Sequence, residues 1–146
     1  MLPPTSTVRL PLRVRIAIDA WARASHPEEA CGLLVGRIAG TANDLETEVR
    51  SATRVRNRSQ SSDRYELDPG DFIAADQRAR ASGYAIVGVW HSHASGAAVP
   101  SETDRRNAWT NFSYMIVSIG AHTSSAPSMR SWRLIGERFH EEELCS

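Results

Sequence analysis

Apolar stretches alternate with polar segments along the whole chain, and their lengths and spacing distinguish helices from strands. Residues 12–25 place apolar side chains three and four positions apart, which is the spacing of an amphipathic helix. These apolar positions are Ile16, Ala17, Ala20 and Trp21. The predicted helix ends before Pro27, because the residue before a proline avoids the helical region. The short apolar run over 30–36, which is bounded by glycine, then indicates a buried strand.

A second helix is expected where Asp68 can cap the chain with Pro69 in the first position, and Gly83 would end it. The nearly all-apolar run over 84–90 predicts a central strand that leads directly into His91. The other expected elements are a weakly alternating start over 8–10, a half-exposed strand over 45–55, a serine-rich mobile loop over 56–62, a helix over 101–109, strands over 114–119 and 129–139, and an acidic tail over 141–143. Helices that interleave with strands indicate an α/β or mixed-sheet domain.

Composition narrows the class of protein. The 146 residues, 41% of them hydrophobic, suit one compact domain over 1–146 with a full core. The 17 basic residues, all arginine, balance 17 acidic residues, so no broad charged face is available for nucleic acid or a membrane surface. No apolar stretch approaches the ~20 residues of a membrane span, and no signal-peptide pattern is present. With only Cys31 and Cys145 as cysteines, we expect a cytoplasmic protein without a disulfide framework.

The candidate chemistry lies directly after the predicted central strand. His91 and His93 are two positions apart, so in an extended chain both imidazoles face the same side and can reach one ion. Asp104, in the first turn of the next predicted helix, can supply a third ligand. Two histidines and one carboxylate form a known catalytic zinc set that leaves a position open for water. Bound zinc would lower the pKa of that water from about 15.7 to about 7.

Hydrolysis also needs a base for the water proton and a donor for the developing oxyanion. Glu28 and Glu29 stand together before the first buried strand, and position alone does not separate them as bases. Ser101, three residues before Asp104, carries a hydroxyl suited to the oxyanion. A simpler explanation also exists, because Ser101 and Asp104 have the spacing of a helix N-cap and an acidic first turn.

The whole set resembles the JAMM motif of the MPN-type (Mov34/MPN/PAD-like) zinc metallopeptidases. That motif is an upstream glutamate, then His-x-His, then a spacer ending in Pro-Ser-x-x-Asp, and here ten residues separate His93 from Asp104. The segment from His26 to Gly36 is similar to the family's Pro-x-Glu-x-Cys-Gly-Leu-Leu-x-Gly segment, and this alignment selects Glu29. Further likenesses lie at Tyr65–Pro69, Gly88–Trp90, Met115–Ser118 and Arg130–Arg133. A departure is Ala94, where many members carry proline.

The resemblance implies a mixed β-sheet flanked by helices, the cytidine-deaminase-like MPN/JAMM fold. It also implies one Zn²⁺ per chain, held by His91, His93 and Asp104, together with a catalytic water. Glu29 would act as general base and then as acid, and Ser101 would stabilise the tetrahedral intermediate. Because Ala94 is none of these residues, we expect its substitution to loosen a loop without loss of metal.

The chain is short, and so it resembles the minimal prokaryotic members that process ubiquitin-like sulfur-carrier proteins. The resemblance implies hydrolysis of the peptide or isopeptide bond after the carrier's C-terminal Gly-Gly. Two alternatives stay open, a non-catalytic MPN-type scaffold and a peptidase for another small peptide substrate. Scaffolds typically lack part of the zinc set, whereas all five positions are intact here. A zinc nucleobase deaminase would need a Pro-Cys-x-x-Cys pair, which is missing. A homodimer is also left open.

Overall fold

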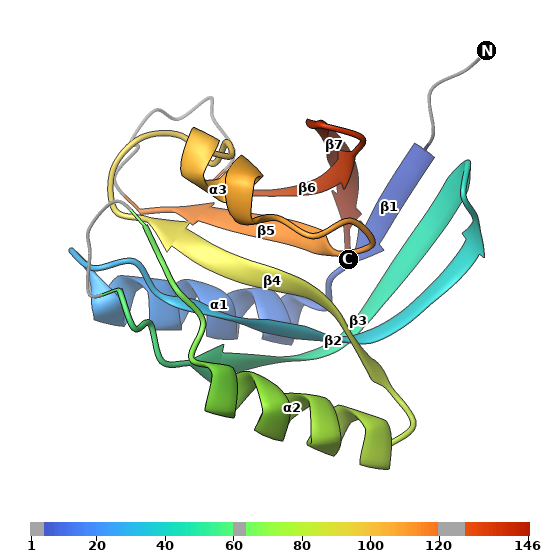
Figure 1. Cartoon of the computed structure of the whole chain (residues 1–146), viewed down its shortest axis with the longest axis horizontal. Helices are drawn as coiled ribbons and strands as arrows, with labels where there is room; N and C mark the ends of the chain where they lie inside the picture. Colours follow the sequence, from blue (N-terminus) through green and yellow to red (C-terminus); the bar gives the residue numbers. More distant parts are fainter. Residues whose placement is uncertain (1–4, 60–63, 120–127) are drawn as a thin grey trace.

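The computed structural model describes residues 5–59, 64–119 and 128–146. Within these ranges, one sheet of seven strands carries three helices (Figure 1). In chain order the elements are β1 (Thr5–Arg9), α1 (Leu12–Ser25), β2 (Cys31–Thr41), β3 (Asp44–Val55), α2 (Pro69–Ala81), β4 (Ala85–His93), α3 (Glu102–Asn107), β5 (Ser113–Ser118), β6 (Met129–Ile135) and β7 (Arg138–Cys145). Of the described helices, none is long and apolar enough to cross a membrane.

The sheet is mixed and closes into a barrel with the strand order β1-β3-β2-β4-β5-β6-β7. Strand β1 pairs in parallel with both β3 and β7, and β4 pairs in parallel with β5. The remaining neighbours are antiparallel. The expected mixed sheet with helices is therefore present, but its closure was not predicted. Closure depends on β1, whose weak alternation does not reveal two partners that lie far away in sequence.

Two hydrophobic clusters pack on opposite faces of the sheet. Leu33 and Leu34 are neighbours on β2, so their side chains point to opposite faces, and each belongs to a different cluster. Helix α1 contributes to the cluster with Leu34, and α2 contributes Ala75 to the cluster with Leu33. Because β2 and β4 are covered on both faces, they are rigid supports for residues at their ends.

The boundaries of α1 agree with the predicted helix over 12–25, but its buried face differs from the predicted one. The helix buries Val14, Ile18 and Ala22, which are spaced four residues apart. Ile16, which was placed on the apolar stripe, is 59% exposed. Trp21 is half-buried and stacks on Trp90, with ring centroids 5.7 Å apart. The two overlapping apolar spacings in this helix explain the error, since only packing on the sheet selects between them.

Helix α2 confirms the predicted cap. The Asp68 side chain accepts a hydrogen bond from the backbone N–H of Asp71, and Pro69 stands in the first turn. Helix α3 is shorter than the predicted 101–109, since it covers only Glu102–Asn107.

The C-terminal region corrects two expectations. Instead of one strand over 129–139 and an acidic tail over 141–143, the chain forms a hairpin of β6 and β7. Gly136 turns this hairpin with a φ of 64°, which glycine adopts readily. Glu142 of the expected tail is only 3% exposed. It accepts hydrogen bonds from Arg133 Nε at 3.1 Å and Ser131 Oγ at 2.8 Å, and these partners make burial of the carboxylate possible.

The segment expected as a mobile loop over 56–62 lies partly outside the described residues, which end at 59 and resume at 64. Its described part is held in place, because Asn57 forms an isolated antiparallel bridge with Leu67. The Arg58 N–H donates to the Glu66 carbonyl at 2.9 Å, and the Asp68 N–H donates to the Arg56 carbonyl at 3.1 Å.

Candidate metal centre

The two motif histidines lie at the end of β4, inside the strand instead of after it. Their Nε2 atoms are 3.2 Å apart, as expected for side chains two positions apart on one face of a strand. His91 is fully buried, whereas the side chain of His93 is 13% exposed. The strand thus presents one enclosed donor and one that reaches the solvent edge of the site.

The carboxylate of Asp104 completes a three-atom cluster with the histidines. Its Oδ2 lies 3.2 Å from His91 Nε2 and 3.3 Å from His93 Nε2. Asp104 is held there by a capping box, since its backbone N–H donates to Ser101 Oγ and its Oδ2 accepts the Ser101 backbone N–H. The N-cap explanation of Ser101 and Asp104 is therefore correct, and the same cap aims the carboxylate at the histidines.

The spacing of the three donor atoms fits a zinc ion. Ligand atoms at 2.0–2.1 Å around a tetrahedral centre are separated from one another by about 3.3 Å. The three separations here are 3.2, 3.2 and 3.3 Å. Two imidazole nitrogens and one carboxylate oxygen are also the donor types that zinc accepts.

Electrostatics place two of the three donors, His91 and Asp104, in the forms that a metal requires. Burial lowers the pKa of His91, and this outweighs the opposing hydrogen bond and charge of Asp104. Burial would also lower the pKa of His93, but the hydrogen bonds to Asp104 and the Ala97 carbonyl raise it overall. Burial opposes ionisation of Asp104, yet its hydrogen bonds to both histidines hold its pKa far below the usual range. Asp104 is therefore ionised, and His91 is neutral at pH 7.

The structure separates the two candidate bases. Glu29 is 3% exposed, and one of its carboxylate oxygens lies with one ring nitrogen each of His91 and His93 in a group whose atoms are all within 4.8 Å of one another. Glu28 is exposed.

Ser101 lies beside Asp104, and its hydroxyl oxygen accepts the Asp104 backbone N–H at 3.0 Å. An oxygen that accepts in this way still carries a proton to donate.

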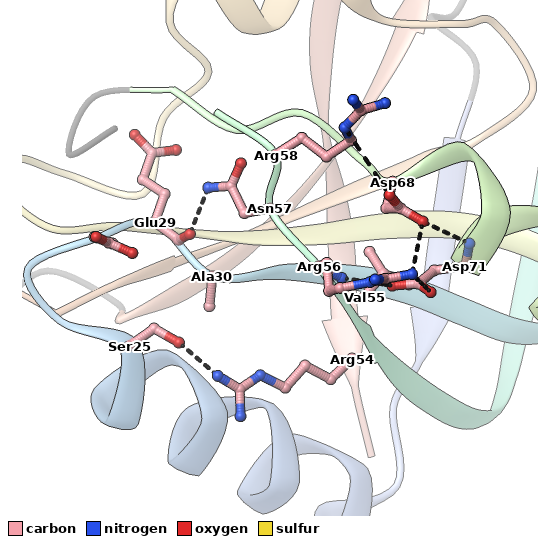
Figure 2. Close-up of a pocket in the computed structure, with 11 residues that line it drawn as sticks. Ser25, Glu29, Ala30, Arg54, Val55, Arg56, Asn57, Arg58, Asp68 and Asp71 are labelled. Atoms are coloured by element: carbon pink, nitrogen blue, oxygen red, sulfur yellow. Dashed lines mark hydrogen bonds and ion pairs between the residues drawn. The ribbon is translucent and has the colours of Figure 1, made fainter. Parts of the chain in front are cut away.

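Sequence reasoning missed Asn57, which connects Glu29 to the segment after β3. Its Nδ2 donates to the Glu29 carbonyl at 2.7 Å, as Figure 2 shows. Its Oδ1 accepts the backbone N–H groups of Ser59 at 3.0 Å and Glu66 at 2.9 Å. A lone asparagine in a polar stretch gives no sequence signal of such contacts.

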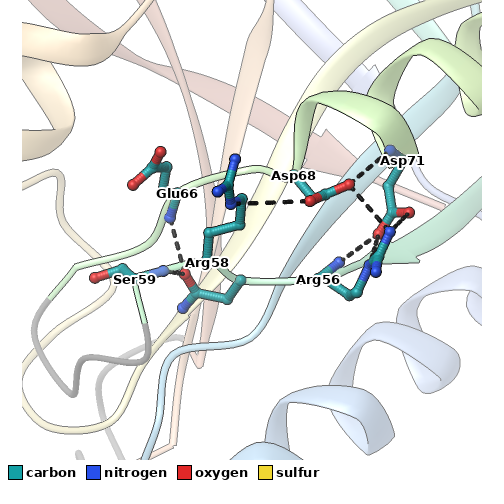
Figure 3. A network of polar contacts seen from close by, with 7 residues as sticks. Arg56, Arg58, Ser59, Glu66, Asp68 and Asp71 are labelled. Carbon is teal, nitrogen blue, oxygen red and sulfur yellow. Dashed lines mark hydrogen bonds and ion pairs between the residues drawn. The ribbon is translucent and has the colours of Figure 1, made fainter.

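A polar cavity of about 630 Å³ borders Glu29 on the side of α1 and β3 (Figure 2). Arg54 donates to Ser25 Oγ at 3.1 Å, while Arg56 contacts carboxylate oxygens of Asp68 at 3.2 Å and Asp71 at 2.9 Å. Figure 3 shows how the last three residues link the end of β3 to the start of α2. The hydrogen bonds to Arg56 lower the pKa of Asp71, so this link is ionic at neutral pH. The ion pairs of Arg56 in the cavity wall thus hold the segment that also carries the next residue, Asn57.

A second, larger cavity of about 830 Å³ begins at Asp104. Its walls include the aromatic side chains of Tyr65, Phe72, Trp109 and Tyr114. Phe72 and Trp109 meet edge to face with centroids 6.0 Å apart, and Trp109 is 55% exposed. The site therefore opens into an aromatic groove that the sequence motifs did not reveal.

The chain resembles known proteins over most of its length. A desampylase from Haloferax volcanii is 36% identical over 94 residues, which cover 63% of each chain, so this chain spans under two thirds of that relative. A CysO-cysteine peptidase from Mycobacterium tuberculosis is 27% identical over 128 residues, which cover 88% of this chain and 83% of the relative.

A solution structure of a protein from Desulfitobacterium hafniense superposes with a TM-score of 0.81 at 31% identity, covering 94% of this chain and 91% of that one. A solution structure of a protein from Salinibacter ruber superposes with a TM-score of 0.68 at 32% identity, covering 95% of this chain and 90% of that one. The profile of the family described as prokaryotic homologs of the JAB domain matches residues 11–135. Since this match includes every residue of the candidate centre, we conclude that the chain belongs to the prokaryotic JAB-domain family.

Proposed function

We propose that this protein is a zinc-dependent metallopeptidase that hydrolyses the bond after the C-terminal Gly-Gly of a ubiquitin-like or sulfur-carrier protein. The observation that carries the proposal is the convergence of His91 Nε2, His93 Nε2 and Asp104 Oδ2 to mutual distances of 3.2–3.3 Å. The names of two relatives, a desampylase and a CysO-cysteine peptidase, support a peptidase acting on such protein tails.

Zinc held by these three donors would supply an activated water at neutral pH and polarise the scissile carbonyl. The remaining steps belong to the chain's own residues. Glu29 is buried beside the histidines without being one of the three close donors, so it suits the transfer of a proton. We assign it to take the proton of the attacking water and to deliver it to the leaving amine.

Ser101 is assigned to the oxyanion. Its hydroxyl oxygen accepts the Asp104 N–H at 3.0 Å, which fixes the oxygen, and its proton remains available to a substrate oxygen. A donor that is already oriented stabilises the tetrahedral intermediate without reorganisation cost.

The aromatic groove that begins at Asp104 is assigned to the substrate tail. A Gly-Gly end is narrow enough to pass a confined metal site, and the residues before it would lie against Tyr65, Phe72 and Trp109. Aromatic side chains bury large area with few rotatable bonds, so they bind an extended peptide at low entropic cost.

The test is cleavage of a ubiquitin-like carrier that bears a short extension after its C-terminal Gly-Gly. The wild-type protein should release the extension, and Glu29→Gln should lower the rate by about 10²–10⁴-fold while zinc content is unchanged. Glu28→Gln is the matched control, since Glu28 is adjacent but exposed, and it should retain the wild-type rate. Full activity of Glu29→Gln would contradict the assignment. Absence of cleavage by a zinc-loaded wild-type protein would favour a scaffold.

A further inference from the structure

The two ligand histidines are oriented in different ways. His93 Nδ1 lies 2.9 Å from the Ala97 carbonyl oxygen, and this hydrogen bond fixes its ring and leaves Nε2 to face the centre. His91 Nδ1 is buried and has no hydrogen-bond partner among the described residues. Metal-bound histidines are almost always oriented through their second nitrogen. His91 therefore needs another support if its Nε2 is to stay aimed at the cluster.

The ring of Tyr65 provides a support of a different kind. Its centroid lies 4.3 Å from that of His91, and the two planes differ by 23°, which is a stacked arrangement. His91 is fully buried, so the imidazole cannot turn into solvent to relieve the contact. A flat ring against one face opposes rotation of the imidazole about its Cβ–Cγ bond, because rotation would drive the ring edge into the neighbour.

Tyr65 is itself held by its neighbours in the chain. The Glu66 N–H donates to Asn57 Oδ1 at 2.9 Å, and the Glu66 carbonyl accepts the Arg58 N–H at 2.9 Å. Asn57 also holds the Glu29 carbonyl at 2.7 Å. The residue adjacent to Tyr65 is thus fixed to the same asparagine that fixes the backbone of the proposed base.

We infer that Tyr65 is a positioning residue for the metal centre, and that its aromatic face does for His91 what the hydrogen bond to Ala97 does for His93. The inference rests on the metal site of the proposed function. It adds a specific requirement, since a planar ring is needed at position 65 and the tyrosine hydroxyl is not.

The experiment measures Co²⁺ binding, because the visible spectrum of Co²⁺ reports the geometry of its ligands. Metal-free protein is titrated in competition with a chelator, for wild type, Tyr65→Phe and Tyr65→Leu. Tyr65→Phe should keep the wild-type affinity and spectrum. Tyr65→Leu should bind about 10–100-fold more weakly, the range seen when a ligand's orienting partner is lost, and its spectrum should change.

Phe72→Leu is the matched control, because Phe72 is an aromatic residue of the same groove that packs on Trp109. Its Co²⁺ affinity should not change. Tyr65→Met also lacks a flat ring, but its flexible side chain can adapt to the site. It replaces Tyr65→Leu if circular dichroism shows that the leucine variant does not fold.

Wild-type affinity and spectrum in a folded non-aromatic variant would overturn the inference while leaving the metal site intact. Equal losses in Tyr65→Phe and Tyr65→Leu would also overturn it, since the hydroxyl would then be responsible. Failure of the wild-type protein to bind Co²⁺ would instead refute the metal site, and with it both proposals.

Discussion

Ser101 combines two roles that a single substitution to alanine would not separate. Its hydroxyl oxygen caps α3 through the Asp104 N–H, and the same hydroxyl is assigned to the oxyanion. A capping side chain contributes about 1 kcal/mol, whereas an oxyanion donor contributes about 10²–10³-fold in rate. Glycine at an N-cap costs only a few tenths of a kcal/mol and has no side-chain proton to donate, so it can distinguish the two.

We therefore expect Ser101→Gly to stay close to the thermal midpoint of the wild type and to lose about 10²–10³-fold in kcat. Ser101→Ala should lose both activity and roughly 1 kcal/mol of stability. Thermal unfolding and cleavage assays on the two variants check this. A Ser101→Gly enzyme with the wild-type kcat would limit Ser101 to the cap.

Cys31 lies two residues after the proposed base but is not a nucleophile. It is 1% exposed, and burial raises the pKa of its thiol to about 12. The thiol is therefore protonated at pH 8, where a thiol reagent needs the thiolate. Cys145 is only partly buried.

For this reason, folded wild-type protein should react with a thiol reagent at Cys145, and folded Cys145→Ser should not react at pH 8. Unfolding in guanidinium chloride should make Cys31 reactive. Rapid labelling of Cys31 in the folded Cys145→Ser variant would show that its thiol is not shielded as described.

At the scale of elements, β7 closes the barrel around a buried ion pair. Glu142 and Arg133 have side chains that are 0% and 5% exposed, with Arg133 Nε 3.1 Å from Glu142 Oε2. Arg133 also donates to Thr47 and Ser113, both at 3.2 Å, so it joins β6 to β3 and β5. Removal of the carboxylate would leave a buried guanidinium without its counter-charge.

Glu142→Ala should therefore lower the free energy of unfolding by about 3–5 kcal/mol. The control is Glu141→Ala on the same strand, whose side chain is 44% exposed beside Arg130 and whose loss should cost about 0–1 kcal/mol. Urea titrations of both variants measure the difference. Equal midpoints for the two would mean that the buried pair does not hold β7 in the barrel.

At the scale of the whole molecule, the sequence predicts those features that correspond to a local pattern of residues. Asp68 with Pro69 marks the start of α2, and the spacing of the histidines to Asp104 marks three residues that the fold does bring together. The choice of Glu29 over Glu28 agrees with its burial, although its catalytic role stays a prediction.

The rest depends on contacts between distant segments. The pairing of β1 with β7 joins the two ends of the described chain, and no local pattern encodes it. The stack of Tyr65 on His91 and the hydrogen bond of Asn57 to Glu29 cross 26 and 28 positions, respectively, and neither has a fixed spacing that a motif could show. Packing, not periodicity, also selected the buried face of α1.

The central claim is that His91, His93 and Asp104 hold one zinc ion. The most direct measurement is the zinc content of purified, refolded protein by native mass spectrometry, before and after treatment with a chelator. We predict one zinc per wild-type chain, loss of zinc on chelation with loss of cleavage, and severe loss of zinc in His91→Ala and in Asp104→Ala but not in His140→Ala. A wild-type protein that binds no zinc, or a His91→Ala variant that retains a full equivalent, would contradict the account.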